Sequence, residues 1–220
     1  MNSEPRFVPA LGRAWLTPFY DLVVGASTRE RRVKRALIQQ AGLAPGQRVL
    51  DLGTGTGTLA LWMKQHIPSL DVAAADGDPA ILAIASRKAA AANTDVRWVD
   101  ALATDLPFPA AYFDRIVSSL FFHHLAWDDK VQTVREAFRV LKAGGELHVA
   151  DWGRPTGAVM RGLFLPVQLL DGFENTRDNL QGRLVLLLEG GGFASVVETR
   201  SFNTMFGTLA LYSAVKSERA

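Results

Sequence analysis

The sequence predicts an α/β fold in which a mostly parallel sheet is covered by helices on both faces. Short apolar runs rich in Val and Ile alternate with longer segments of helical periodicity. A glycine-rich turn follows the first of these runs, at the place where open α/β sheets bind their ligands. The length of 220 residues, with 48% hydrophobic and 21% charged residues, fits a single globular domain.

The alternating pattern assigns the elements in order. Strands are expected at 48–52, 71–75, 96–99, 115–118 and 146–150, and helices at about 28–41, 57–66, 79–92 and 128–142. Asp78 supplies an N-cap before Pro79, and two glycines at 144 and 145 are expected to stop the fourth helix. Beyond residue 150 we expect helical segments at 157–170 and 178–189, then an antiparallel hairpin of strands near 194–202 and 206–216.

No repeat or linker interrupts the chain, so one domain is expected over residues 1–220. Its parts are an N-terminal cap region (1–41), a ligand-binding core (42–151), an insert (152–192) and a C-terminal hairpin (193–220). The sequence leaves a homodimer open.

Composition excludes several classes of protein. Cysteine is absent, which removes disulfides, thiolate metal sites and a cysteine nucleophile, and favours a cytoplasmic location. The first residues lack a signal-peptide pattern and no stretch reaches about 18 apolar residues, so neither export nor a membrane span is expected.

Net charge gives no broad nucleic-acid footprint, because 24 basic residues nearly balance 22 acidic ones. One basic cluster lies on the first predicted helix, at Arg29, Arg31, Arg32, Lys34 and Arg35. We interpret it as a solvated helix face, since Val33, Ala36, Leu37 and Ile38 supply an apolar stripe. Contact with RNA or an acidic ligand is the alternative.

The segment VLDLGTGTG at 49–57 is the strongest single motif: an apolar strand, an acid, a glycine turn and a helix. Glycines allow the backbone to turn sharply and pass close to a ligand. In the nicotinamide pattern the third glycine would fall at position 58, which is Thr58 here. A dinucleotide is therefore disfavoured, and a tight turn without a ligand is the other interpretation.

The second predicted strand, DVAAAD, ends on Asp76. A carboxylate at this strand end can accept two hydrogen bonds from a ribose diol. The alternative is a helix cap, but Asp78 is better placed for that role.

The ordered set of motifs resembles the class I S-adenosylmethionine methyltransferases, in particular the branch of the ubiquinone and menaquinone biosynthesis enzymes. The resemblance spans about residues 18–216 and rests on VLDLGTGTG, AADGDP, VDALATDLPFP, FDRIVSSLFFHHL and REAFRVLKAGGELHVADW. It implies a Rossmann-like, seven-stranded sheet of order 3-2-1-4-5-7-6. It also implies S-adenosylmethionine as cofactor and S-adenosylhomocysteine as product.

The resemblance assigns cofactor contacts by position. It places Asp76 on the ribose with Gly77 beside it, and Ser118 and Ser119 near the sulfonium. At the adenine, Asp100 accepts from the amino group and the N–H of Ala101 donates. Beside the methionine part it places Asp51, Gly53, Thr54 and Gly55.

No catalytic base is assigned, since alignment of an acceptor behind an electrophilic methyl group supplies much of the rate. His123 and His124 follow the fourth strand, and the resemblance favours His124 on the substrate side. The alternative is that the pair only packs this connection. No metal site is expected, because the other histidines, His66 and His148, fall in other elements.

Two apolar segments, about 5–27 and 152–180, are expected to form a lid over a hydrophobic acceptor or simply to complete the core. Tyr20, in the first segment, is the lid residue that the resemblance indicates. The aromatic and apolar residues concerned are Phe7, Trp15, Phe19, Trp152, Met160, Phe164, Leu165, Val167, Leu169 and Phe173.

These patterns favour methyl transfer to oxygen, nitrogen or carbon of a small acceptor, aromatic, quinol-like or lipid-like. The first alternative is an RNA or protein methyltransferase, which the basic helix suggests. Against it, SSLF stands after the fourth strand where an Asn-Pro-Pro-Tyr-like motif would indicate methylation of base amino groups. The second alternative is a module that binds the cofactor without catalysis, and a nicotinamide dehydrogenase ranks last.

Overall fold

A computed structural model describes residues 30–218 and contains a seven-stranded sheet of order β3-β2-β1-β4-β5-β7-β6. The first five strands run parallel, and β7 is antiparallel to both β5 and β6. The predicted fold class and strand order are therefore confirmed. The strands are β1 (Arg48–Leu52), β2 (Asp71–Asp76), β3 (Arg97–Asp100), β4 (Phe113–Ser119), β5 (Leu141–Trp152), β6 (Ala194–Thr204) and β7 (Gly207–Val215).

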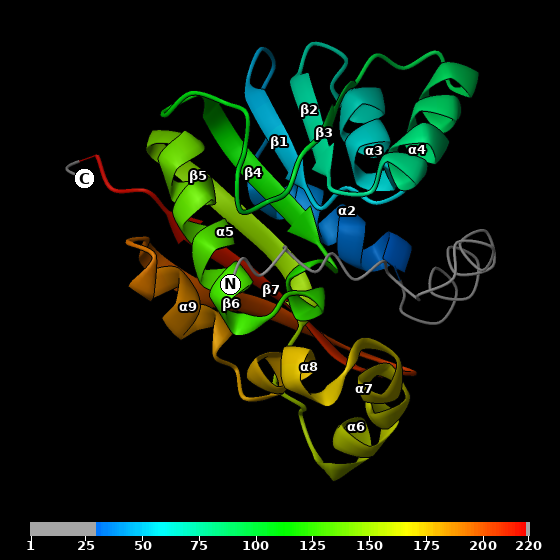
Figure 1. Ribbon diagram of the computed structural model, residues 1–220, viewed down its shortest axis with the longest axis vertical. Helices are drawn as coiled ribbons and strands as arrows, with labels where there is room; N and C mark the ends of the chain where they lie inside the picture. The colour runs from blue at the N-terminus through cyan, green and yellow to red at the C-terminus, as the bar shows by residue number, and fades with distance from the viewer. Residues whose placement is uncertain (1–29, 219–220) are drawn as a thin grey trace, which may run out of the picture.

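Helices cover both faces of this sheet (Figure 1). On one face lie α2 (Glu30–Ala41), α3 (Thr58–His66) and α4 (Pro79–Ala91), and on the other α5 (Trp127–Val140) and α9 (Leu184–Gly190). A third group lies beyond the carboxyl ends of β4 and β5 (Figure 1): α6 (Ala158–Leu163), α7 (Leu165–Asp171) and α8 (Phe173–Leu180). The short 3-10 helix η2 (Phe122–His124) follows β4 and contacts α8.

The apolar runs form strands buried on both sides because successive side chains point to opposite faces. On β1, Val49 packs with α2 and α3, whereas Leu50 packs with α5 and α9. On β4, Ile116 and Val117 divide between the same two clusters. The sheet thus separates two cores, and its carboxyl edge is left to the connecting loops.

The basic helix α2 has the burial pattern expected of a solvated face. Val33, Ala36 and Leu37 of its stripe are buried, Ile38 is partly buried, and the arginines of the described part, Arg31, Arg32 and Arg35, are exposed. Lys34 departs from the prediction, because its side chain is only 12% exposed and pairs with Glu30. Arg29 lies outside the described residues.

Three predicted element bounds were wrong. Helix α5 ends at Val140, and β5 begins at the next residue, because the paired glycines lie inside a long strand rather than after a helix. The helix expected at 178–189 is two helices separated by a turn at Gly182, whose φ of 69° is left-handed. The segment expected at 157–170 is also divided, since α7 restarts at Leu165 with a proline in its first turn.

Lys130 of α5 joins the α6–α8 group to the sheet core. Its ammonium group donates to the Asn175 carbonyl at 2.6 Å and to Asn179 Oδ1 at 3.2 Å, and lies 3.7 Å from Asp178 Oδ2. The side chain is 1% exposed. Because a buried ammonium group is costly without partners, these contacts fix α8 against α5.

No helix within residues 30–218 combines the length and hydropathy needed to cross a membrane.

Replacing Lys130 by Ala should destabilise the fold by about 3 kcal/mol, because it leaves the polar groups of α8 buried without their donor. For a chain of this size the melting temperature should fall by roughly 6–12 °C. Lys142→Ala is the matched control, since Lys142 is 38% exposed in its pair with Asp114 and should contribute about 0–1 kcal/mol. Equal losses in the two variants, measured by thermal unfolding, would contradict this assignment.

Candidate functional site

The glycine turn between β1 and α3 is fastened to the end of β2. The amide groups of Gly53 and Thr54 both donate to the Ala75 carbonyl at 3.0 Å. Gly53, Gly55 and Gly57 have φ values of 70°, 55° and 76°, which explains why glycine occupies each position. The turn therefore has a fixed shape at the carboxyl edge of the sheet.

Asp51 holds this turn from inside. One carboxylate oxygen accepts the Thr54 hydroxyl at 2.7 Å and the Ala60 amide at 3.1 Å. Burial raises the pKa of Asp51 to about 6, and the hydrogen bonds from Thr54 and Ala60 only partly offset this. With the side chain 1% exposed, Asp51 shapes the turn, and its contact with the methionine part of a cofactor stays a prediction.

Asp76 lies beside the same turn at the end of β2. Its Oδ2 accepts the Gly55 amide at 2.8 Å and its Oδ1 accepts the Asp78 amide at 3.1 Å. Burial raises the pKa of Asp76, while these amide bonds act to lower it. Two carboxylate oxygens have about four acceptor positions, so Asp76 retains capacity for further hydrogen bonding.

Asp78 caps α4 as predicted, since its side chain accepts the Ala80 amide at 2.8 Å and Pro79 occupies the first helical turn.

The end of β3 brings Asp100 to the same edge. Asp100 pairs in register with Asp76, and its side chain is exposed. The amide of Ala101, however, donates to the Asp76 carbonyl at 3.1 Å. Because the sheet ladder already uses this N–H, the predicted donation from Ala101 to adenine does not fit the structure.

The two serines that end β4 differ in their surroundings. Ser118 is fully buried and its hydroxyl donates to the Leu52 carbonyl at 2.8 Å, so it joins β4 to β1 rather than facing a ligand. The hydroxyl of Ser119 is buried with no hydrogen-bond partner among the described residues. An unpaired hydroxyl at this strand end is the kind of group that a ligand satisfies.

Two residues at this edge were not anticipated from the sequence. Leu120 has a φ of 57°, which is strained for a bulky side chain and common at functional sites. Phe121 then lies against the glycine turn: a Cβ on Gly53 would be 2.2 Å from Phe121 Cγ. A glycine or asparagine after Ser119 would have indicated a positive φ at this turn, whereas leucine gives no such signal.

The histidines of η2 meet carboxylates from two other elements. His123 Nδ1 lies 2.7 Å from Asp151 Oδ1, and its amide donates to Asp151 Oδ2 at 3.3 Å. Burial acts to lower the pKa of His123, but the carboxylates of Asp151 and Asp171 raise it. Burial lowers the pKa of His124 to about 3, which keeps this imidazole neutral at physiological pH.

The insert at 152–180 was expected either to complete the core or to form a lid over a hydrophobic acceptor, and its apolar residues divide into a buried and an exposed set. Trp152, Phe164 and Val167 are buried in the core, whereas Leu169 and Phe173 are 73% and 51% exposed. Further exposed apolar residues on the same helices are Val159, Leu163, Leu165 and Leu170. The insert thus completes the core with one side and presents an apolar surface with the other. Tyr20 and the rest of the first apolar segment lie outside the described residues.

Residues 49–145 match the methyltransferase domain family. The chain carries a methyltransferase domain. This confirms the resemblance to class I S-adenosylmethionine methyltransferases that the motifs indicated. The match covers β1 to the middle of β5, which includes the glycine turn, Asp76, Asp100 and the η2 histidines.

The chain is also similar to methyltransferases named for a quinone and for a hydroquinone. It is 41% identical over 145 residues to a demethylmenaquinone methyltransferase of Thermus thermophilus, covering 64% of each chain. It is 32% identical over 151 residues to a chloroplastic 2-methyl-6-phytyl-1,4-hydroquinone methyltransferase of Arabidopsis thaliana, covering 66% of this chain and 44% of that one. The aligned region therefore spans less than two thirds of either relative.

A solved structure supports the fold of this chain independently. The YcgJ protein of Bacillus subtilis superposes with a TM-score of 0.68 over 86% of this chain and 99% of that one, at 19% identity.

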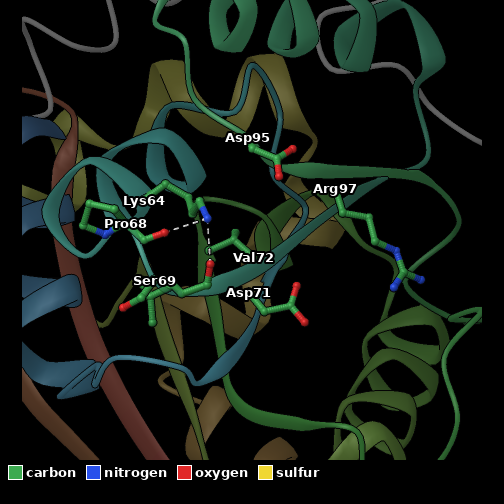
Figure 2. A pocket seen from close by; sticks show the side chains of 8 residues that line it. Lys64, Pro68, Ser69, Asp71, Val72, Asp95 and Arg97 are labelled. Carbon is green, nitrogen blue, oxygen red and sulfur yellow. Dashed lines mark hydrogen bonds between the residues drawn. The ribbon is translucent and has the colours of Figure 1, made fainter.

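A polar hollow of about 290 Å³ lies at the opposite edge of the sheet, between the start of β2 and the start of β3 (Figure 2). Lys64 is held there by the carbonyl groups of Pro68 and Leu70 at 2.9 and 2.8 Å. Ligands of open α/β sheets bind at the carboxyl ends of the strands, so this hollow is not the cofactor site of the methyltransferase.

Alanine at Gly53 and Gly55 should separate conformational strain from a steric clash. A Cβ at Gly55 meets no atom within 4 Å, so Gly55→Ala should cost only about 1–2 kcal/mol for a left-handed alanine. Gly53→Ala should cost about 1–3 kcal/mol more because Phe121 must move. Urea unfolding measures both costs. The additional loss should largely disappear when Phe121→Ala is combined with Gly53→Ala, and its persistence would exclude the clash.

The raised pKa of Asp51 predicts a pH dependence of stability. Protonated Asp51 is favoured in the folded state, so its contribution is fully present below pH 3.8 and is lost as the pH rises through about 6. The stability of the wild type relative to Asp51→Asn should therefore fall by about 2 kcal/mol between pH 4 and pH 7. Denaturant unfolding of both proteins across this range provides the difference. A difference that stays constant, or grows with pH, would show that Asp51 is not perturbed in this way.

Proposed function

We propose that this chain is an S-adenosylmethionine-dependent methyltransferase whose acceptor is a hydrophobic, quinol-like small molecule. The observation that carries the proposal is the arrangement of Asp76 beside the glycine turn, with capacity for further hydrogen bonding. The named substrates of the two quinone-pathway relatives support the acceptor class.

The residues at the carboxyl edge fit this cofactor. Gly55 leaves open space where a side chain would stand, which suits close approach of a ligand to the backbone. Asp76 would accept both ribose hydroxyls, with Gly77 beside it, and Asp100 would accept from the adenine amino group. Gly53, Thr54 and Gly55 would face the methionine part, with Ser119 on the sulfonium side.

Bound S-adenosylmethionine supplies an electrophilic methyl group. The chain's own part is to position the acceptor and to exclude water, which accounts for much of the rate in such transfers. The apolar surface of α6–α8 would hold the hydrophobic part of the acceptor near η2, which contacts α8. His124, neutral and at the mouth of the site, stays a substrate-side candidate, and Tyr20 remains a proposed lid residue.

The alternatives are weaker on the same observations. Helix α2 buries its apolar stripe in the core and exposes its arginines, as an ordinary surface helix does. An RNA acceptor therefore has no support beyond the charge of this helix. A cytoplasmic location and a homodimer remain predictions based on the sequence.

The proposal predicts that S-adenosylhomocysteine binds with micromolar affinity and that Asp76→Asn weakens binding about 10- to 100-fold. Asparagine can accept at only one of the two side-chain positions, so charge-assisted bonds to the ribose and to the turn are lost. Asp78→Asn is the matched control: asparagine caps a helix equally well, and affinity should not change. Calorimetric titration measures all three proteins.

A methyl-transfer screen of reduced quinols, phenols and amines, with labelled S-adenosylmethionine, tests the acceptor. Transfer to quinols that Asp76→Asn reduces would support the proposal. Binding without transfer to any compound would favour the non-catalytic module, and absence of binding in a folded protein would refute the cofactor assignment.

A further inference from the structure

The side chains of His123, His124 and Asp171 converge from two elements. The histidines are consecutive in η2, and Asp171 is the last residue of α7. One ligand atom from each lies within 4.8 Å of the others. The Asp171 carboxylate is 3.7 Å from His123 Nε2 and 3.6 Å from His124 Nδ1.

These separations are too long for hydrogen bonds. Within the described part of the chain, the structure assigns no hydrogen bond to the carboxylate of Asp171, although its side chain is only 13% exposed. A largely buried carboxylate without a hydrogen bond is costly. The two imidazoles and the carboxylate therefore converge on one place without hydrogen bonds between Asp171 and either histidine.

The spacing suits a metal ion of the zinc type. Ligand atoms about 2.1 Å from a tetrahedral ion lie about 3.4 Å from one another. This is close to the 3.7 Å from His123 Nε2 to Asp171 Oδ2 and to the 3.6 Å from His124 Nδ1 to Asp171 Oδ1. The remaining adjustment falls on His124, whose side chain is 25% exposed and whose ring centroid lies 3.9 Å from that of His123. Two imidazoles and one carboxylate are typical ligands of Zn²⁺ or Fe²⁺, whereas Mg²⁺ and Ca²⁺ prefer oxygen alone.

Asp151 supplies the support that such a site requires. Its Oδ1 lies 2.7 Å from His123 Nδ1, and its carboxylate also accepts the amides of His123 and Trp152. A histidine that donates Nδ1–H to a carboxylate presents its Nε2 lone pair to a metal ion, and this pairing is a recurrent feature of metal sites. In His123 that nitrogen faces Asp171.

We propose that His123 Nε2, His124 Nδ1 and the carboxylate of Asp171 form a binding site for a divalent transition-metal ion such as Zn²⁺. Binding releases any proton on His123 Nε2, because only the neutral imidazole coordinates. Three protein ligands leave a fourth position open, which is the arrangement of catalytic rather than structural zinc sites. If the proposed function holds, an acceptor hydroxyl would occupy that position; the metal site itself does not depend on it.

The test is titration of the untagged, chelator-treated protein with Zn²⁺ against a chromophoric competitor, and with Co²⁺ followed by its visible absorption. The wild type should bind one equivalent, and Mg²⁺ in excess should not displace it. Asp171→Asn and His124→Ala should each weaken binding at least 10-fold. His66→Ala is the matched control, since His66 is exposed at the end of α3, and it should bind as the wild type does.

S-adenosylhomocysteine binding by the same variants separates this proposal from the proposed function. Retained cofactor-product binding with lost Zn²⁺ binding would support the site. The proposal is overturned if the wild type binds no stoichiometric Zn²⁺, or if Asp171→Asn and His124→Ala bind it as His66→Ala does. Loss of methyl transfer in these variants without any Zn²⁺ binding by the wild type would also overturn it, and would assign the cluster to proton transfer.

Discussion

The site depends on two carboxylates that are held close to one short turn. Asp51 fastens the glycine turn from within the sheet, and Asp76 fastens it from the neighbouring strand through the Gly55 amide. Desolvation works against both charges, since burial raises the pKa of each. Hydrogen bonds offset part of this cost, because Asp51 accepts the Thr54 hydroxyl and the Ala60 amide and Asp76 accepts the Gly55 amide. The result is a rigid backbone at the point where the strands end.

The acceptor side is built on a different principle. The α6–α8 group contributes no strand to the sheet, and it is attached by the buried side chains of Phe164 and Val167 and by the contacts of the Lys130 ammonium group with α8. Its remaining surface is rich in exposed leucine and phenylalanine. A rigid cofactor edge and a separately anchored apolar insert allow one scaffold to accept different acceptors, because the insert can vary without disturbing the turn.

Most of the fold could be predicted from the sequence because its signals are local. Alternation of apolar runs with helical patterns gave the strands, and the Asp78–Pro79 pair marked the start of α4. The errors lie where local chemistry was ambiguous: two glycines that usually end a helix lie inside β5, and Gly182 divides a segment whose apolar content reads as one helix. The order of the strands in the sheet could be predicted only from the resemblance to the family, since local patterns do not determine which strands pair.

The predicted cofactor contacts rest on position at the strand ends, and two of them do not fit the structure. Ala101 and Ser118 lie at the expected strand ends, but position along a strand does not show whether a polar group is already used by the sheet. The amide of one continues the ladder and the hydroxyl of the other bridges two strands. Residues at a strand end therefore divide into those that support the edge and those that face outward, and only the structure distinguishes them.

The histidine cluster shows a limit of another kind. The other histidines, His66 and His148, belong to α3 and β5, and the third proposed ligand is instead a carboxylate 47 positions after His124. Three features bring it there: the strained turn at Leu120, the docking of α8 on η2, and the end of α7 at Asp171. None of these is encoded as a local motif. The acceptor side is assembled by tertiary contacts, so its chemistry becomes visible only when the insert is placed against the carboxyl end of β4.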